Sequence, residues 1–167
     1  MATAYPRKTS EIRSAGLAIA TAGLIAGTLD LAETLIVFGA KSPLVIAAGL
    51  LGMQSASRGG AAIYILGVLL HYLIVFSAAA IYFAVSRRLH FLLEHWLICG
   101  LFFGVAIDVV MRMIVLPLSA MHARGPYQYH ELAHGLAAHA ILVGLPIAFT
   151  VQRFGGVVEP EGENVGR

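Results

Sequence analysis

Four apolar stretches, each long enough to cross the hydrocarbon core of a membrane, dominate this sequence. They cover about residues 14–38, 61–85, 96–118 and 130–152, and a helix needs about 20 residues to span a core of roughly 30 Å. Hydrophobic residues make up 59% of the chain and charged residues 12%, whereas a soluble domain is close to half apolar and a quarter charged. The sequence therefore predicts an all-α, polytopic membrane protein with four transmembrane helices.

The segments outside these spans predict the rest of the architecture. Residues 43–53 are apolar but too short to cross a bilayer, so we expect a short interfacial or re-entrant helix between the first two spans. Residues 1–13 are polar and basic and should form a cytoplasmic N-terminal segment. Residues 154–167 have no apolar period and should form a disordered cytoplasmic tail. The transmembrane domain then covers 14–153.

The lysine and arginine residues predict the orientation. One side of the predicted bundle carries Arg7, Lys8, Arg13, Arg87, Arg88 and Arg153, and the other carries Lys41, Arg58 and Arg124. Because cytoplasmic loops are richer in lysine and arginine, both termini are expected in the cytoplasm. The net charge of +2 is too small to indicate a nucleic-acid partner.

Each span carries an ionisable residue well inside it, and these residues are Asp30, His71, Asp108 and His139. An ionisable group at membrane depth is costly, so it marks a functional site or a helix-pairing device. Small residues lie on the same faces, at Gly16, Ala20, Gly23 and Gly27, at Gly67, at Gly100 and Gly104, and at Gly135. Small residues let membrane helices pack closely, so we expect the four groups to face inward.

Two pairs of charged residues extend this predicted polar site. Asp108 and Arg112 are four residues apart, which predicts an intrahelical ion pair that fixes the rotation of the helix. Alternatively, Arg112 anchors an anionic head group or substrate. Asp30 and Glu33 are three residues apart and lie on the same side of the first span. Two carboxylates this close repel one another when both are charged, which suits the binding of protons or cations. The alternative is that Thr34, Arg112 or a histidine satisfies Asp30 as a packing contact.

The two histidines inside the predicted spans allow three interpretations. His71 and His139 each lie roughly 15 Å below the outer surface, at 1.5 Å per residue. This matched depth would suit the axial ligands of a b-type haem. A mononuclear metal held by two histidines and a carboxylate is a second possibility. The third is that the histidines form hydrogen bonds with Asp30 or Asp108 across the bundle, and the sequence favours this one.

The start of the fourth span contains an HExxH motif. On a helix, His130 and His134 would present two imidazoles one turn apart, with Glu131 beside them as a general base. The motif is typical of zinc proteases, and Asp30 of the first span is a candidate for the third zinc ligand. Two features depart from the intramembrane proteases: the motif lies at the mouth of its span, and no glycine follows the aspartate. A non-catalytic metal site using His130, His134 and Glu33 is a further hypothesis.

Several short motifs resemble a family of small bacterial inner-membrane proteins of unknown function. They are Gly27-Thr-Leu-Asp30, Gly49-Leu-Leu-Gly52, Leu66-Gly-Val-Leu-Leu-His71, Val115-Leu-Pro-Leu-Ser-Ala120, and His139 with Leu142-Val-Gly-Leu-Pro-Ile-Ala148. The resemblance covers most of residues 15–153. It implies a four-helix protein of the bacterial inner membrane, but it implies no activity, cofactor or catalytic residue.

These observations favour a non-enzymatic function. We expect a small membrane protein with an intramembrane polar site for a proton, a metal or a prosthetic group, working in the bilayer as a homo-oligomer or an accessory subunit of a membrane complex. The alternatives are a haem b protein with His71 and His139 as axial ligands, a zinc protease using His130, Glu131 and His134, and a purely structural scaffold.

Overall fold

The computed structural model describes residues 7–154, and it describes side chains from Ala15 onward. All regular structure in this part of the chain is helical. Four helices are long and apolar enough to cross a membrane, namely Ala15–Phe38, Ala61–Ser86, Trp96–Leu118 and Tyr129–Phe154. The prediction of an all-α protein with four long apolar helices is therefore confirmed.

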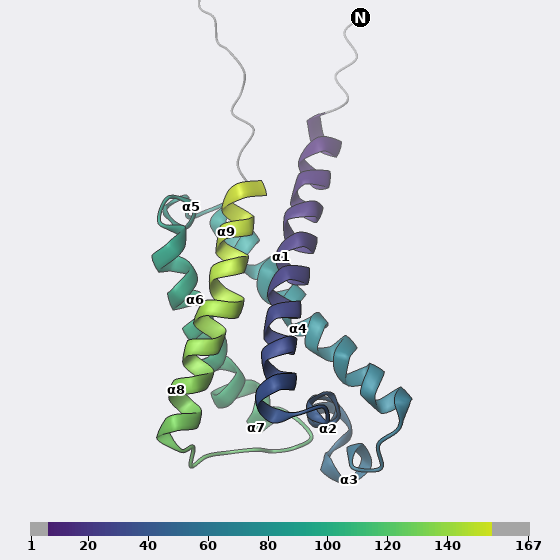
Figure 1. Cartoon of the computed structure of the whole chain (residues 1–167). Coiled ribbons are helices and arrows are strands. Elements are labelled where there is room, and N and C mark those ends of the chain that lie inside the picture. The colour runs from purple at the N-terminus through teal and green to yellow at the C-terminus, as the bar shows by residue number, and fades with distance from the viewer. Residues whose placement is uncertain (1–6, 155–167) are drawn as a thin grey trace, which may run out of the picture.

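The elements follow one another along the chain with short connections (Figure 1). They are α1 (Arg7–Phe38), α2 (Ser42–Leu51), α3 (Met53–Ala56), α4 (Ala61–Ser86), α5 (Phe91–Glu94), α6 (Trp96–Val110), η1 (Met111–Val115), α7 (Leu116–Leu118), α8 (Tyr129–Ala138), η2 (His139–Gly144) and α9 (Leu145–Phe154). Helix α1 begins inside the polar segment predicted for residues 1–13, whose first six residues lie outside the described part. The predicted tail over 154–167 also lies outside it, apart from Phe154.

The long helices pack around small side chains. Helix α1 packs against α4 and α9, and α6 packs against η2 and α9. Along α1, Ala18, Ala22 and Ala26 are fully buried, because alanine at helical spacing lets neighbouring backbones approach. The larger core side chains come from the later helices, and they include Tyr82, Val143, Ile147 and Val151.

Glycines create the closest helix contacts. A Cβ atom at Gly104 would overlap the carbonyl group of His139, and one at Gly144 would overlap the backbone of Gly100 and Gly104. The predicted small-residue face of the third span is therefore the face that contacts the fourth. Gly16 differs from the prediction, because nothing lies within 4 Å of its Cβ position.

Two π-helical segments, η1 and η2, interrupt the third and fourth long helices just before a proline. Segment η1 precedes Pro117, and η2 precedes Pro146. A proline cannot donate a hydrogen bond to the carbonyl four residues earlier, and its ring crowds that carbonyl. A wider π turn accommodates both effects. Arg112 lies within η1, and His139 is the first residue of η2. Both widened segments therefore contribute to the polar site.

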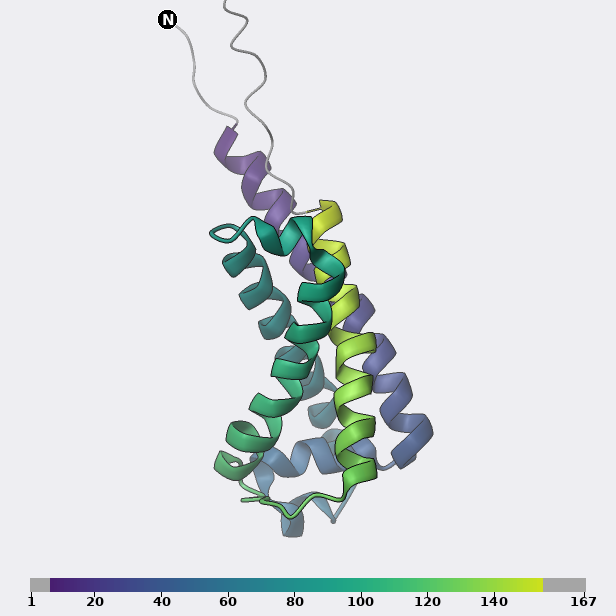
Figure 2. The same cartoon turned by 90° about the vertical axis from the view of Figure 1, so that its left-hand side faces the viewer.

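Helix α2 runs crosswise to the long helices at the end where α1 stops; Figure 1 shows it end-on and Figure 2 from the side. The Ser42 hydroxyl donates to the carbonyl oxygens of Gly39 (2.7 Å) and Thr34 (3.2 Å), which fixes the turn after α1. Gly67 of α4 lies against the carbonyl of Pro43. This glycine therefore serves the contact with α2 rather than a contact with another long helix.

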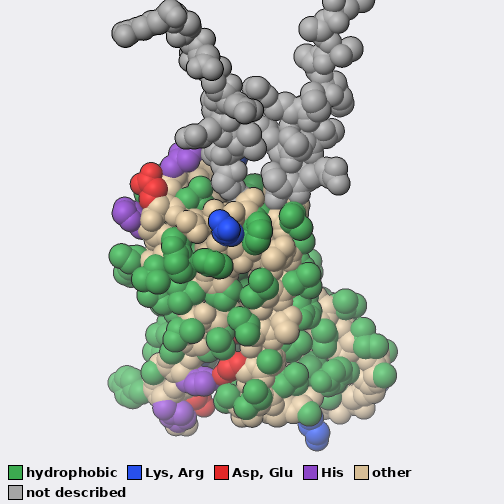
Figure 3. Space-filling model, turned by 45° about the horizontal axis from the view of Figure 1, so that its top comes forward, with side chains coloured by type: hydrophobic (Ala, Val, Ile, Leu, Met, Phe, Trp, Pro, Cys, Tyr) green, Lys and Arg blue, Asp and Glu red, His purple; other side chains and the backbone are tan. Residues whose placement is uncertain are grey.

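The two ends of the molecule differ in their elements. The start of α1, helix α5 and the end of α9 lie together at one end, with α2, α3 and α7 at the other (Figure 1). Hydrophobic side chains cover most of the described surface in Figure 3, and charged and histidine side chains gather toward the two ends. Many large apolar residues are exposed, including Leu69, Leu73 and Phe102. Surfaces this apolar are typical of contact with lipid or with other proteins.

Candidate functional site

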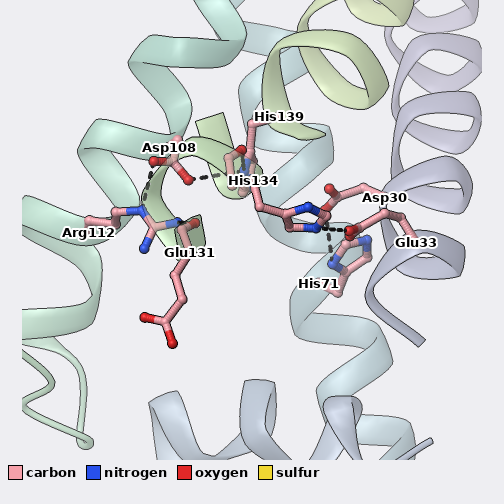
Figure 4. A network of polar contacts seen from close by, with 9 residues as sticks. Asp30, Glu33, His71, Asp108, Arg112, Glu131, His134 and His139 are labelled. Atoms are coloured by element: carbon pink, nitrogen blue, oxygen red, sulfur yellow. Dashed lines mark hydrogen bonds and ion pairs between the residues drawn. The ribbon is translucent and has the colours of Figure 1, made fainter. Parts of the chain in front are cut away.

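The ionisable residues predicted to face inward do lie inside the bundle (Figure 4). Asp30, His71 and Asp108 are 9%, 7% and 1% exposed, respectively, and His139 is half-buried. They form two separate groups. The Asp30 cluster consists of Asp30 and His71, and the Asp108 cluster consists of Asp108, Arg112 and His139.

The Asp30 cluster joins α1 to α4. The Nε2 atom of His71 donates to the carbonyl oxygen of Gly27 at 2.9 Å, and Nδ1 lies 4.0 Å from Oδ2 of Asp30. A carbonyl oxygen can only accept a hydrogen bond, so Nε2 carries a proton. A neutral His71 would then turn the Nδ1 lone pair toward the Asp30 carboxylate. One additional proton, on Nδ1 or on Asp30, removes this repulsion.

The Asp108 cluster joins α6 to α8 and η2. The Nε atom of Arg112 donates to Oδ2 of Asp108 at 2.7 Å, so the two residues form the intrahelical pair that their spacing predicts. The Nδ1 atom of His139 lies 3.2 Å from Oδ1 of Asp108 and 2.9 Å from the carbonyl oxygen of Gly135. Both oxygens of the carboxylate are therefore engaged, and Arg112 balances its charge.

Neighbouring groups hold Arg112 in place. Its Nη2 atom donates to the carbonyl oxygen of Glu131 at 3.2 Å, and its guanidinium carbon lies 5.0 Å from the ring centre of Tyr127. The Tyr127 hydroxyl donates to the carbonyl oxygen of Arg112 at 3.2 Å. Tyr127 lies between the third and fourth predicted spans, and no local pattern in the sequence reveals its contact with Arg112.

Glu33 pairs with His134 rather than with Asp30. Its Oε1 atom contacts Nε2 of His134 in α8, and Phe38 lies edge-on to the same imidazole. The side chain of His134 is 45% exposed and that of Glu33 is 17% exposed. This contact therefore forms the outer margin of the site, and it links the first long helix to the fourth.

A cavity of about 80 Å³ lies between the two clusters. Asp30, His71 and His139 line it together with apolar side chains, among them Ile74 and Met111. A water molecule occupies roughly 30 Å³ in the liquid, so the cavity has room for water beside three polar groups. Protons can move along such hydrogen-bonding groups inside a membrane.

The metal and haem interpretations gain no support from this geometry. Within residues 7–154, no group of three or more histidine, cysteine, aspartate or glutamate side chains is arranged to hold a metal ion. The space between His71 and His139 is far smaller than the roughly 300–1,000 Å³ of ordinary ligand pockets, and Nε2 of His71 is bound to a carbonyl oxygen. The residues present therefore do not fit a haem between these two histidines.

The HExxH motif lies on the first turns of α8, but its members do not form a zinc site. His130 and Glu131 are exposed, and the Glu131 carboxylate points away from the polar groups (Figure 4). His134 is paired with Glu33, while Asp30 lies against His71. A zinc site needs at least three protein ligands in one place, and the described residues provide no such group here.

No protein-family model, curated protein or solved structure matches this chain.

Proposed function

We propose that this chain is a small integral membrane protein that binds an exchangeable proton inside the bilayer at the Asp30–His71 pair. The observation that supports the proposal is the hydrogen bond from Nε2 of His71 to the carbonyl of Gly27. It turns Nδ1 toward Asp30, so the pair is complementary to one additional proton. The described lysine and arginine side chains do not line the adjoining cavity, so we propose that an added proton balances the Asp30 carboxylate.

The apolar exterior supports the membrane placement. Exposed side chains such as Leu69, Leu73 and Phe102 would be costly in water and favourable in lipid. We propose that both termini lie in the cytoplasm of a bacterial cell and α2 at the outer interface, an orientation that the distribution of lysine and arginine supports. Fusions of a reporter that is active only outside the cytoplasm test this orientation. A fusion in the loop around Arg58 should be active, and a C-terminal fusion should be inactive; the reverse result contradicts the proposal.

The assembly proposed for the chain is a homo-oligomer or an accessory subunit of a membrane complex. A four-helix chain of 167 residues has no large domain outside the bilayer in its described part, so a partner would contact the exposed faces of the long helices. The mass of the detergent-purified protein, measured with its bound detergent subtracted, distinguishes a homo-oligomer from a single chain.

Difference infrared spectroscopy tests the proton-binding site. Spectra of the reconstituted protein recorded at two pH values should contain paired signals from a carboxyl group and an imidazole. Asp30→Asn and His71→Gln should each remove the pair of signals, because each variant removes one member of the site. Glu94→Gln, in α5 at the end of the molecule, serves as the matched control and should leave the signals unchanged. Persistence of the signals in both Asp30→Asn and His71→Gln would refute the proposal.

A further inference from the structure

The third long helix and α4 enclose an apolar cleft. Helix α4 packs mainly on α1 and α2, while α6 packs on η2 and α9. The seam between α4 and α6 is left partly open, and it contains a cavity of about 420 Å³. The lining side chains are almost all apolar, with Leu73, Ile81, Phe103, Ala106 and Val110 among them. This volume lies within the range of ordinary ligand sites.

The apolar cleft adjoins the polar cavity of the Asp30 cluster. Ile74, Ala78, Ile107 and Met111 line both spaces. A further apolar cavity of about 300 Å³ lies between α2, α4 and α7, and Ile74 and Met111 line it as well. Together these spaces form an amphipathic site, with a long apolar part and a small polar end.

The mouth of the cleft opens on the side of the bundle that would face lipid. Leu73 and Ile81 of α4 are 61% and 58% exposed, and Val110 of α6 is 45% exposed. Under the membrane placement proposed above, a molecule dissolved in the hydrocarbon region could enter sideways between α4 and α6. It would not have to cross the polar ends of the bundle.

The charges at the polar end select the kind of head group. Asp30 carries a potential negative charge, and no lysine or arginine lines the described cavity. Arg112 is bound to Asp108, so it is not available to a phosphate group. An anionic head group buried there would meet the Asp30 carboxylate with no lysine or arginine in the cavity lining to pair with it, which is unfavourable even when the Asp30–His71 pair holds its proton. An uncharged oxygen can instead exchange hydrogen bonds with His71, His139 or Asp30.

We infer that this site binds an uncharged lipid with one long apolar chain and a small hydroxyl or carbonyl head group. The chain lies in the α4–α6 cleft, and the head group lies against Asp30, His71 and His139. The inference rests on the proposed function, because it uses the same polar site and the same membrane placement. A quinone and a long-chain alcohol share this chemistry, so the experiment uses one of each.

Binding to the purified full-length protein in detergent tests the inference. The probes are radiolabelled decyl-substituted benzoquinone and tetradecanol, with phosphatidylglycerol as the anionic competitor. At least one uncharged probe should bind saturably, and phosphatidylglycerol should not displace it. Binding by only one of the two identifies which head group is accepted. The absence of saturable binding by both, or full displacement by phosphatidylglycerol, would overturn the inference.

Two substitutions on α6 separate the cleft from the rest of the surface. Ala106→Phe places a ring in the cleft, and it should weaken binding by about tenfold or more. Val109→Phe adds the same ring at an exposed position outside the cavities and should leave binding unchanged. Equal binding by the Ala106→Phe variant and the unmodified protein contradicts the inference.

The infrared experiment distinguishes this inference from the proposed function. The first outcome is that neither probe binds, while the unmodified protein gives the carboxyl and imidazole signals and the two variants do not. The ligand inference then fails and the proton site stands. If the probes bind but those signals are absent, the proton site fails and the cleft stands as an apolar ligand site.

Discussion

His139 and Arg112 bind different oxygens of the same carboxylate. The Nδ1 atom of His139 lies 3.2 Å from Oδ1 of Asp108, and the Nε atom of Arg112 lies 2.7 Å from Oδ2. Asp108 therefore contacts η2 through one carboxylate oxygen, while Arg112 neutralises the carboxylate through the other, within the same long helix. The Asp108 carboxylate does not line the cavity between the two clusters, whereas Asp30, His71 and His139 do. The Asp108 carboxylate therefore faces a permanent positive charge, whereas the Asp30 carboxylate faces the imidazole of His71.

Removing the Asp108 carboxylate should destabilise the bundle strongly. Asp108→Ala leaves Arg112, whose side chain is only 16% exposed, without its carboxylate partner, and breaking a buried ion pair costs up to about 3–5 kcal/mol. The double variant Asp108→Leu/Arg112→Leu removes both charges and should recover most of this loss. Reversible unfolding in mixed micelles measures the free energy of unfolding. A loss below about 1 kcal/mol for the single variant would show that the pair is not buried in the folded protein.

The close contact between the third and fourth long helices depends on Gly104. Gly104→Ala would push a methyl group into the backbone at His139 and Ala140, and overpacking of this kind costs about 1–3 kcal/mol. Gly16→Ala is the matched control, because its added methyl group meets nothing within 4 Å. Thermal unfolding should show a lower midpoint for Gly104→Ala and little change for Gly16→Ala. Equal midpoints would mean that the helices do not touch at Gly104.

Local sequence spacing predicted the parts of the structure that one helix determines by itself. The long helices follow from hydropathy, and the Asp108–Arg112 pair follows from residues four apart on one helix. The sequence named Asp30 and Asp108 as the carboxylates that meet His71 and His139, but it could not predict which histidine lies beside which aspartate, because this depends on the rotation and neighbours of separate helices. Nor could the sequence predict that α4 and α6 leave an open seam between them.

Backbone groups account for much of what the sequence could not reveal about the polar site. The carbonyl oxygens of Gly27, Glu131 and Gly135 accept hydrogen bonds from His71, Arg112 and His139, respectively. Every residue has a carbonyl, so no residue type marks these positions. The π turns before Pro117 and Pro146 are also backbone features that the sequence could not reveal. Proline signals a disturbance of the helix, but it does not specify that the disturbance becomes a wider turn.

The outer contact between Glu33 and His134 should contribute much less to stability than the Asp108 cluster. The side chain of His134 is 45% exposed, and exposed ion pairs contribute about 0.2–1 kcal/mol. Glu33→Gln should therefore lower the free energy of unfolding by less than about 1 kcal/mol. The same unfolding assay used for Asp108→Ala provides the comparison. A loss as large as that of Asp108→Ala would show that Glu33 is a central member of the polar site.

The HExxH motif should not confer zinc-dependent stability. His134 is paired with Glu33, and His130 and Glu131 are exposed on the first turn of α8. Treatment of the purified protein with a strong chelator should therefore leave its unfolding midpoint unchanged, as should His130→Ala. Elemental analysis of the untreated protein provides an independent measurement. Stoichiometric zinc that is lost in His130→Ala would restore the metal-site hypothesis.

Gly135 should be energetically coupled to Arg112. A Cβ atom at residue 135 would lie 2.9 Å from Oδ1 of Asp108 and would overlap Nη2 of Arg112. Arg112 cannot simply move aside, because Asp108, the Glu131 carbonyl and Tyr127 all hold it. Gly135→Ala should therefore destabilise the unmodified protein.

Most of this cost should disappear when Arg112→Ala is already present, because the overlapping atom is then absent. A double-mutant cycle on the free energy of unfolding measures the coupling, which should fall in the range of about 0.5–3 kcal/mol for residues in contact. Additive effects of the two substitutions would show that Gly135 does not contact the guanidinium group. In that case another feature would have to explain why glycine occupies this position on α8.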